Sequence, residues 1–163
     1  MKNTAMSLMV KTCVVLVALL GVLICAFWYP FILSLLTVGP VDVIPTPEQE
    51  LQFYSMLAFH WITSIPCFII LLLIWQIADD IKRDTVFHVK TVRRFRGIVC
   101  ILFVDLIIFI IGNIASFMIG WNDLALAYLC LAVVGLAIMC VFAIASHYVM
   151  KATALKEELE GVV

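Results

Sequence analysis

Charged residues are scarce in this chain of 163 residues. Only 13% of them are Asp, Glu, Lys or Arg, whereas 66% are hydrophobic. Soluble domains are nearer one quarter charged and one half apolar. A domain of this size cannot bury so large an apolar excess in its own core. The composition therefore excludes a soluble globular protein and predicts that lipid is the solvent.

Sequence signatures of chemistry are also lacking. The chain has no Gly-rich phosphate loop, no G-x-S-x-G nucleophile motif and no C-x-x-C pair. All six cysteines fall inside apolar runs, where a small buried side chain is a better interpretation than a disulfide or zinc ligand. We therefore expect no enzyme activity, no metal site and no cofactor.

Four long apolar runs are present, separated by short polar segments. The predicted spans cover residues 12–36, 51–78, 97–120 and 124–150. Each is long enough to cross ~30 Å of hydrocarbon at ~1.5 Å per residue. A polar loop, 79–96, joins the second and third spans, and the tail 151–163 continues the helical pattern. The predicted fold class is all-α, a polytopic membrane protein with four transmembrane helices in an antiparallel up-down bundle, forming one integral domain over residues 1–163.

Positive charge lies on one side of these spans only. Segments 1–11, 79–96 and 151–163 hold 2, 6 and 2 Lys or Arg residues, which are all ten in the chain. Cytoplasmic segments of membrane proteins are enriched in Lys and Arg. We therefore expect both termini and the loop 79–96 to lie in the cytoplasm.

Asp105 is the only acid inside an apolar run; Asn113 lies on the same span and His60 on the second. An acid near the bilayer centre costs ~3 kcal/mol, so it must face the protein interior, be neutral or be paired. Depths worked out from the helical rise allow a contact between His60 and Asp105. Two interpretations stay open: a proton- or ion-sensitive pair, or an interhelical hydrogen bond of ~0.6 kcal/mol. We favour the second.

Small residues recur every fourth position on the third predicted span, at Gly112, Ser116 and Gly120. This spacing lets another helix approach closely. The spacing does not decide whether that helix belongs to the same chain or to a second copy in a homo-oligomer. Gly120 also begins a predicted tight turn, 120–123, before the fourth span.

The loop 79–96 is the densest concentration of charge. Its candidate binding residues are six cations and one aromatic ring: Lys82, Arg83, Phe87, Lys90, Arg93, Arg94 and Arg96. Such residues can contact anionic lipid headgroups at ~1 kcal/mol each, or bind a cytoplasmic protein. Direct binding of nucleic acid is not expected, because the segment is short and lies at the membrane surface.

The segment IADDIKRDTVFHVKTVRRFRGI resembles the signature of a bacterial domain-of-unknown-function family of small four-helix membrane proteins. Phe87 matches the Phe of that family, and residues 93–96 match the basic start of its third helix, with Phe in place of Leu. Val86, His88 and Thr91 depart from the Pro, Ser and Asn of the family pattern. Members are often encoded beside a small helix-turn-helix regulator, so the resemblance implies a regulatory partner and a location in the bacterial inner (plasma) membrane.

The leading hypothesis is a small bacterial inner-membrane protein that regulates or senses through its basic loop and acidic tail. The alternative is a small transporter or proton-coupled permeation subunit that uses Asp105 and His60. A third hypothesis is a bacteriocin-immunity or envelope-stress protein. The polar residues are concentrated on the second and third spans, which favours a role other than transport.

Overall fold

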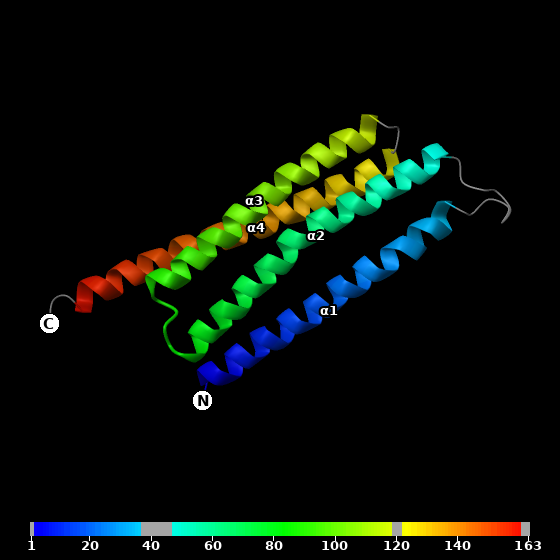
Figure 1. The fold of residues 1–163 in the computed structure, drawn as a ribbon. Helices are drawn as coiled ribbons and strands as arrows, with labels where there is room; N and C mark the ends of the chain where they lie inside the picture. The colour runs from blue at the N-terminus through cyan, green and yellow to red at the C-terminus, as the bar shows by residue number, and fades with distance from the viewer. Residues whose placement is uncertain (1, 37–46, 119–121, 161–163) are drawn as a thin grey trace.

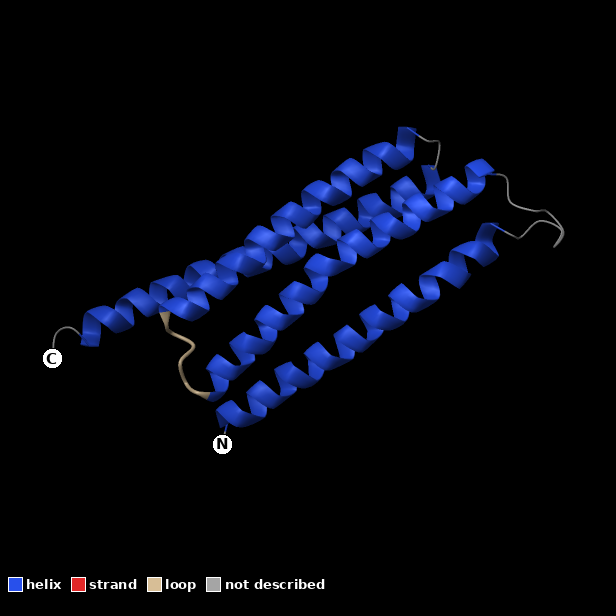
Figure 2. Ribbon diagram, viewed as in Figure 1, coloured by secondary structure: helices blue, strands red, loops and turns tan. Residues whose placement is uncertain are grey.

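The computed structural model describes residues 2–36, 47–118 and 122–160, and these form four helices (Figures 1 and 2). They are α1, Lys2–Leu36; α2, Pro47–Lys82; α3, Val89–Met118; and α4, Asn122–Glu160. Each contains a stretch long and apolar enough to cross a membrane. The predicted all-α class and four spans are confirmed, and the chain is a multi-pass membrane protein.

The helices pack in the order in which they occur in the chain. Close backbone contacts join α1 to α2, α2 to α3, and α3 to α4, and within the described residues no other pair of helices is joined in this way. Neighbouring helices run antiparallel, so the start of α1 and the end of α4 lie at the same end of the molecule as the connection from α2 to α3 (Figure 1). We call the last turn of α2, residues 83–88 and the first two turns of α3 the basic end.

The helices extend beyond the predicted spans into the polar segments. Helical structure continues into the predicted cytoplasmic loop 79–96, since α2 continues to Lys82 and α3 begins at Val89. Polarity marks where a helix leaves the hydrocarbon, and not where its backbone hydrogen bonds stop. For the same reason α1 begins at Lys2 instead of near residue 12, and α4 continues into the tail as predicted. The tight turn predicted at Gly120 lies outside the described residues.

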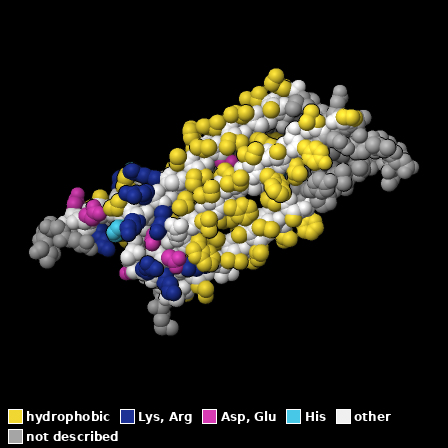
Figure 3. Space-filling model, in the orientation of Figure 1, with side chains coloured by type: hydrophobic (Ala, Val, Ile, Leu, Met, Phe, Trp, Pro, Cys, Tyr) yellow, Lys and Arg dark blue, Asp and Glu magenta, His cyan; other side chains and the backbone are white. Residues whose placement is uncertain are grey.

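Few side chains are buried. Most large apolar side chains point outward over the middle of the helices (Figure 3). This is the arrangement expected when lipid covers the surface. The buried core consists of Ile70 and Ile77 of α2 and Ile98 of α3. Phe95 and Phe142 pack against this core, which brings α4 to the same cluster.

Three aromatic rings form a second contact further from the basic end. The ring centroids of Phe59, Phe109 and Tyr128 are 5.4 to 6.2 Å apart, and each pair meets edge to face. Such pairs contribute about 0.5–1.5 kcal/mol beyond the area they bury. The three rings come from α2, α3 and α4, so they join these helices at a single point.

Candidate functional site

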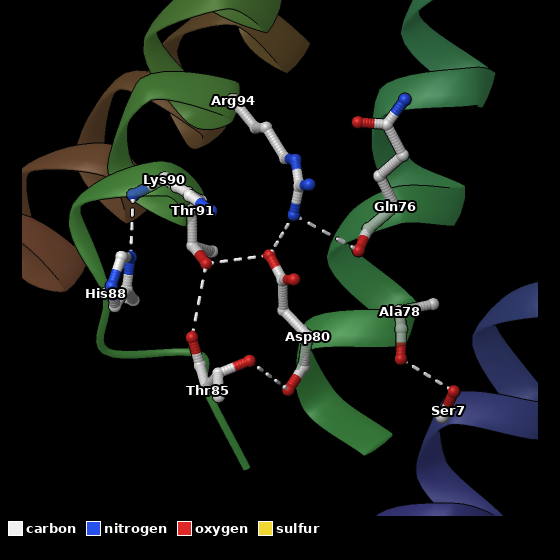
Figure 4. Close-up of polar contacts among 9 residues, drawn as sticks. All are labelled: Ser7, Gln76, Ala78, Asp80, Thr85, His88, Lys90, Thr91 and Arg94. Atoms are coloured by element: carbon white, nitrogen blue, oxygen red, sulfur yellow. Dashed lines mark hydrogen bonds and ion pairs between the residues drawn. The ribbon is translucent and has the colours of Figure 1, made fainter. Parts of the chain in front are cut away.

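The carboxylate of Asp80 is the centre of the basic end. It forms an ion pair with Arg94 and accepts a hydrogen bond from the Thr91 hydroxyl at 2.7 Å (Figure 4). Arg94 also donates to the backbone carbonyl of Gln76 at 3.4 Å. The side chains of Asp80 and Arg94 are 15% and 26% exposed, so the pair is largely shielded from water. Asp80 thus ties the last turn of α2 to the first turns of α3.

Backbone hydrogen bonds give the six-residue connection a defined shape. The amide of Thr85 donates to the carbonyl of Asp80 at 2.9 Å, which closes the end of α2. Asp84 has a φ of 58°, a left-handed conformation that short polar side chains tolerate better than most. At the start of α3 the Nδ1 atom of His88 accepts a hydrogen bond from the amide of Lys90 at 3.2 Å, so His88 caps the helix.

Asp79, the neighbour of Asp80, is directed to the other adjacent helix. Its carboxylate accepts a hydrogen bond at 2.6 Å from the Lys11 ammonium of α1. The same ammonium lies 4.7 Å from the centroid of the Trp75 ring, within the range of a cation–π interaction. Nearby, the buried Ser7 hydroxyl donates to the carbonyl of Ala78 at 2.6 Å. Two successive acids therefore hold α1 and α3 to the same turn of α2.

Four of the predicted basic residues stay available to a partner. Lys82, Arg83, Lys90 and Arg93 are exposed, and none of them forms a salt bridge with another residue that the structure describes. Phe87 is 48% exposed in the same connection. Lys and Arg side chains gather at this end of the molecule, away from the apolar middle (Figure 3). The basic end therefore presents cations and one aromatic ring on an ordered support.

Arg96, the last of the predicted cations, points across to α4. One of its guanidinium nitrogens, Nη2, donates to the thioether sulfur of Met150 at 2.9 Å. A thioether is a weak acceptor, and a guanidinium has five N–H donors. Arg96 thus remains exposed and able to bind an anion.

The polar candidates inside the spans are not brought together. Asp105 is buried on α3, and its Oδ1 atom has no hydrogen-bond partner in the described part of the chain. His60 is on α2, and its Nε2 atom lies 4.0 Å from the sulfur of Cys25 on α1. The Oδ1 atom of Asp105 therefore does not form the hypothesised contact with His60. Asn113 is half-buried on α3.

Gly112 is a close-packing position, although the neighbour is a side chain. A Cβ atom at this residue would overlap the ring of Phe59. The sequence predicted that another helix packs closely at Gly112, and in the structure the group that packs there is an aromatic ring of α2 in the same chain. Ser116 lies one turn further along α3 and is half-buried, whereas Gly120 is outside the described residues.

The sequence interpretation missed the acids that organise the basic end. Asp79 and Asp80 were read as part of a polar loop, and Thr91 only as a departure from a family pattern. A signal was present: two acids directly after an apolar run, followed by a cluster of cations. Acids at a helix C-terminus oppose the helix dipole, so they need cationic partners nearby.

Comparison with known proteins gives one assignment. No curated protein and no solved structure matches the chain. A family model described as "Protein of unknown function (DUF2975)" matches residues 42–163. The match covers α2, α3 and α4 together with the basic end, and it leaves α1 outside. With four long apolar helices and a match over most of its length, the chain belongs to the DUF2975 family.

Proposed function

We propose that the protein has a regulatory or sensing role in the inner membrane of a bacterium, and that it acts by binding a cytoplasmic protein at its basic end. In this proposal both termini face the cytoplasm, and the role is not enzymatic. The observation that supports it is the Asp80 network, which holds a short connection in one shape while four cations beside it stay exposed.

An ordered surface favours binding because less conformational entropy is lost when the complex forms. Exposed Phe87 and Arg93 are of residue types that are enriched at protein interfaces. Opposite charge on the partner would speed association and select against other surfaces. We expect the partner to present an acidic patch. The resemblance to a family encoded beside helix-turn-helix regulators makes such a regulator our first candidate.

The test compares two charge-neutralised forms of the full chain in detergent. One carries Lys82→Gln, Arg83→Gln, Lys90→Gln and Arg93→Gln together; the control carries Lys151→Gln, which removes an exposed cation of the tail. Proteins that copurify from the native cells are quantified by mass spectrometry. We expect a cytoplasmic regulator with the wild type and the control, and its loss with the loop variant. Equal recovery by all three forms would refute the proposal.

A second candidate function is movement of protons or ions through the span that holds Asp105. One observation favours it: Asp105 is 8% exposed, and its Oδ1 atom has no hydrogen-bond partner among the described residues. An interhelical hydrogen bond therefore does not account for this oxygen. The transport alternative predicts that a titratable group is needed at this depth.

The Asp105→Asn variant separates this candidate from a packing role. Asn has nearly the same size and can form hydrogen bonds, but it cannot ionise. If Asp105 carries protons, a pH-sensitive dye inside proteoliposomes will report flux for the wild type and none for Asp105→Asn, although both have the same thermal midpoint. If Asp105 only packs, neither form will conduct, and Asp105→Leu will remain folded.

A further inference from the structure

An apolar groove runs between α3 and α4 on their exposed side. It has a volume of about 440 Å³. Its lining includes Arg96, Cys100 and Phe103 of α3, and Met139, Ala143 and Ser146 of α4. Residues three or four positions apart share one side of a helix, so each set forms a continuous stripe. Cys100, Phe103 and Ala143 are exposed, so the groove opens to the surrounding lipid.

Among the described residues that line the groove, Arg96 is the one charged residue, and it lies at the end nearest the basic end. None of these described residues is acidic. The hydrogen bond from Arg96 to Met150 carries the guanidinium from α3 toward α4, at the mouth of the groove. Arg96 directly precedes the apolar part of α3, and Phe103 lies seven residues further, or ~10 Å along the helix. The groove therefore begins at the level of lipid headgroups and descends into the hydrocarbon.

We propose that this groove is a binding site for one anionic glycerophospholipid. The phosphate accepts hydrogen bonds from Arg96, and an acyl chain lies along Cys100, Phe103 and Ala143. A planar guanidinium presents paired N–H donors that match phosphate oxygens. Arg93, one turn earlier on α3, is also exposed and forms no salt bridge with a described residue. It adds positive charge beside the headgroup.

Charge complementarity selects a lipid over a second copy of the chain. A helix from another copy would cover Arg96 and take its charge out of contact with headgroups and water, which is costly at the edge of the hydrocarbon. A phospholipid instead satisfies both parts of the groove, since its phosphate and its acyl chain have the same order along the membrane normal as Arg96 and Phe103. Basic pockets between transmembrane helices are a known type of lipid headgroup site.

Native mass spectrometry of the full chain in a neutral detergent tests this proposal. The probes are phosphatidylglycerol and phosphatidylcholine with identical acyl chains. We expect the wild type to prefer phosphatidylglycerol about fivefold, which corresponds to about 1 kcal/mol for one cation near the surface. Arg96→Gln should remove most of this preference, and the charge of Arg93 accounts for what remains. Lys156→Gln removes an exposed cation of the tail, outside the groove and outside the basic end, and should leave the preference unchanged.

A second pair of variants tests the apolar part. Ala143→Phe fills the groove and should lower the occupancy of phosphatidylglycerol several-fold, while Ala137→Phe, on an exposed position of α4 outside the groove, should not. An unchanged preference in Arg96→Gln would overturn the proposal. An equal loss in Lys156→Gln would also overturn it, because that result would indicate diffuse surface charge. Displacement of the lipid by inorganic phosphate alone would also overturn it. So would a dimer that dissociates in Ala143→Phe without any change in bound lipid.

Discussion

Replacing Asp80 with Ala removes the acceptor that holds the basic end together. Thr91 keeps an acceptor, because the carbonyl of Thr85 lies 3.3 Å from its hydroxyl. Arg94 loses its ion pair and retains only the long hydrogen bond to Gln76. Hydrogen bonds to charged groups contribute about 1.5–3 kcal/mol, and water reaches part of the Arg94 side chain, so we expect a loss of about 2 kcal/mol in the free energy of unfolding.

The thermal midpoint in detergent measures this loss. For a chain of this length each kcal/mol changes the midpoint by ~2–4 °C, so Asp80→Ala should lower it by ~4–8 °C. Asp80→Asn keeps an oxygen for Thr91 and removes only the charge, so its effect should be about half as large. The matched control is Asp84→Asn, since Asp84 is an exposed acid of the same connection. Within the described residues its side chain accepts one hydrogen bond, from Asn3 at 3.2 Å, and Asn tolerates its left-handed backbone.

Trypsin provides a local measurement of the same change. It cleaves after Lys82, Arg83 and Lys90, which flank the connection that Asp80 holds. Cleavage there should be faster in Asp80→Ala than in the wild type, because looser backbone enters a protease site more readily. If Asp80→Ala and Asp84→Asn have the same midpoint and the same cleavage rate, the Asp80 network does not order the basic end and our reasoning is wrong.

Two further predictions concern packing and topology. Gly112→Val should lower the free energy of unfolding by about 1–3 kcal/mol, because its side chain would overlap an aromatic ring of α2. Gly135→Ala has open space around the added Cβ, so it should leave the free energy of unfolding unchanged or raise it by about 0.5–1 kcal/mol. Equal thermal midpoints for the two variants would contradict the contact at Gly112. In a background without the native cysteines, a cysteine at Asp42 should react with an impermeant thiol reagent in intact cells, and one at Lys90 should not. Labelling at Lys90 alone would reverse the orientation.

The fold could be predicted from the sequence because a lipid-exposed helix is encoded locally. The apolar run 51–78 indicates the second helix, and α2 contains it; α2 begins four residues earlier at Pro47, a residue type that suits the first position of a helix. The residues at which α2 ends and α3 begins could not be predicted in this way. Charged residues such as Lys82 and Lys90 continue a helix in water as readily as apolar residues do in lipid, so polarity did not indicate where helical structure stops.

The contacts of the candidate site depend on which face each helix turns to its neighbours. The sequence indicates that Asp105 and His60 lie at similar depths, but depth does not determine rotation about the helix axis. In the structure the Nε2 atom of His60 lies 4.0 Å from the sulfur of Cys25 on α1, whereas Asp105 is buried on α3 and its Oδ1 atom has no hydrogen-bond partner among the described residues. Helix rotation also explains why Asp79 contacts α1 whereas Asp80 contacts α3. Successive residues on a helix point about 100° apart.

The sequential packing of the helices has a consequence for how the protein is made. Each helix after the first has, as a close backbone neighbour, the helix synthesised just before it. The chain can therefore pack while translation continues, because no helix after α1 waits for a later one to supply its first contact. The bond between Asp80 and Arg94 can form when the first turns of α3 leave the ribosome. Three helices are then joined before α4 arrives to complete the aromatic contact through Tyr128.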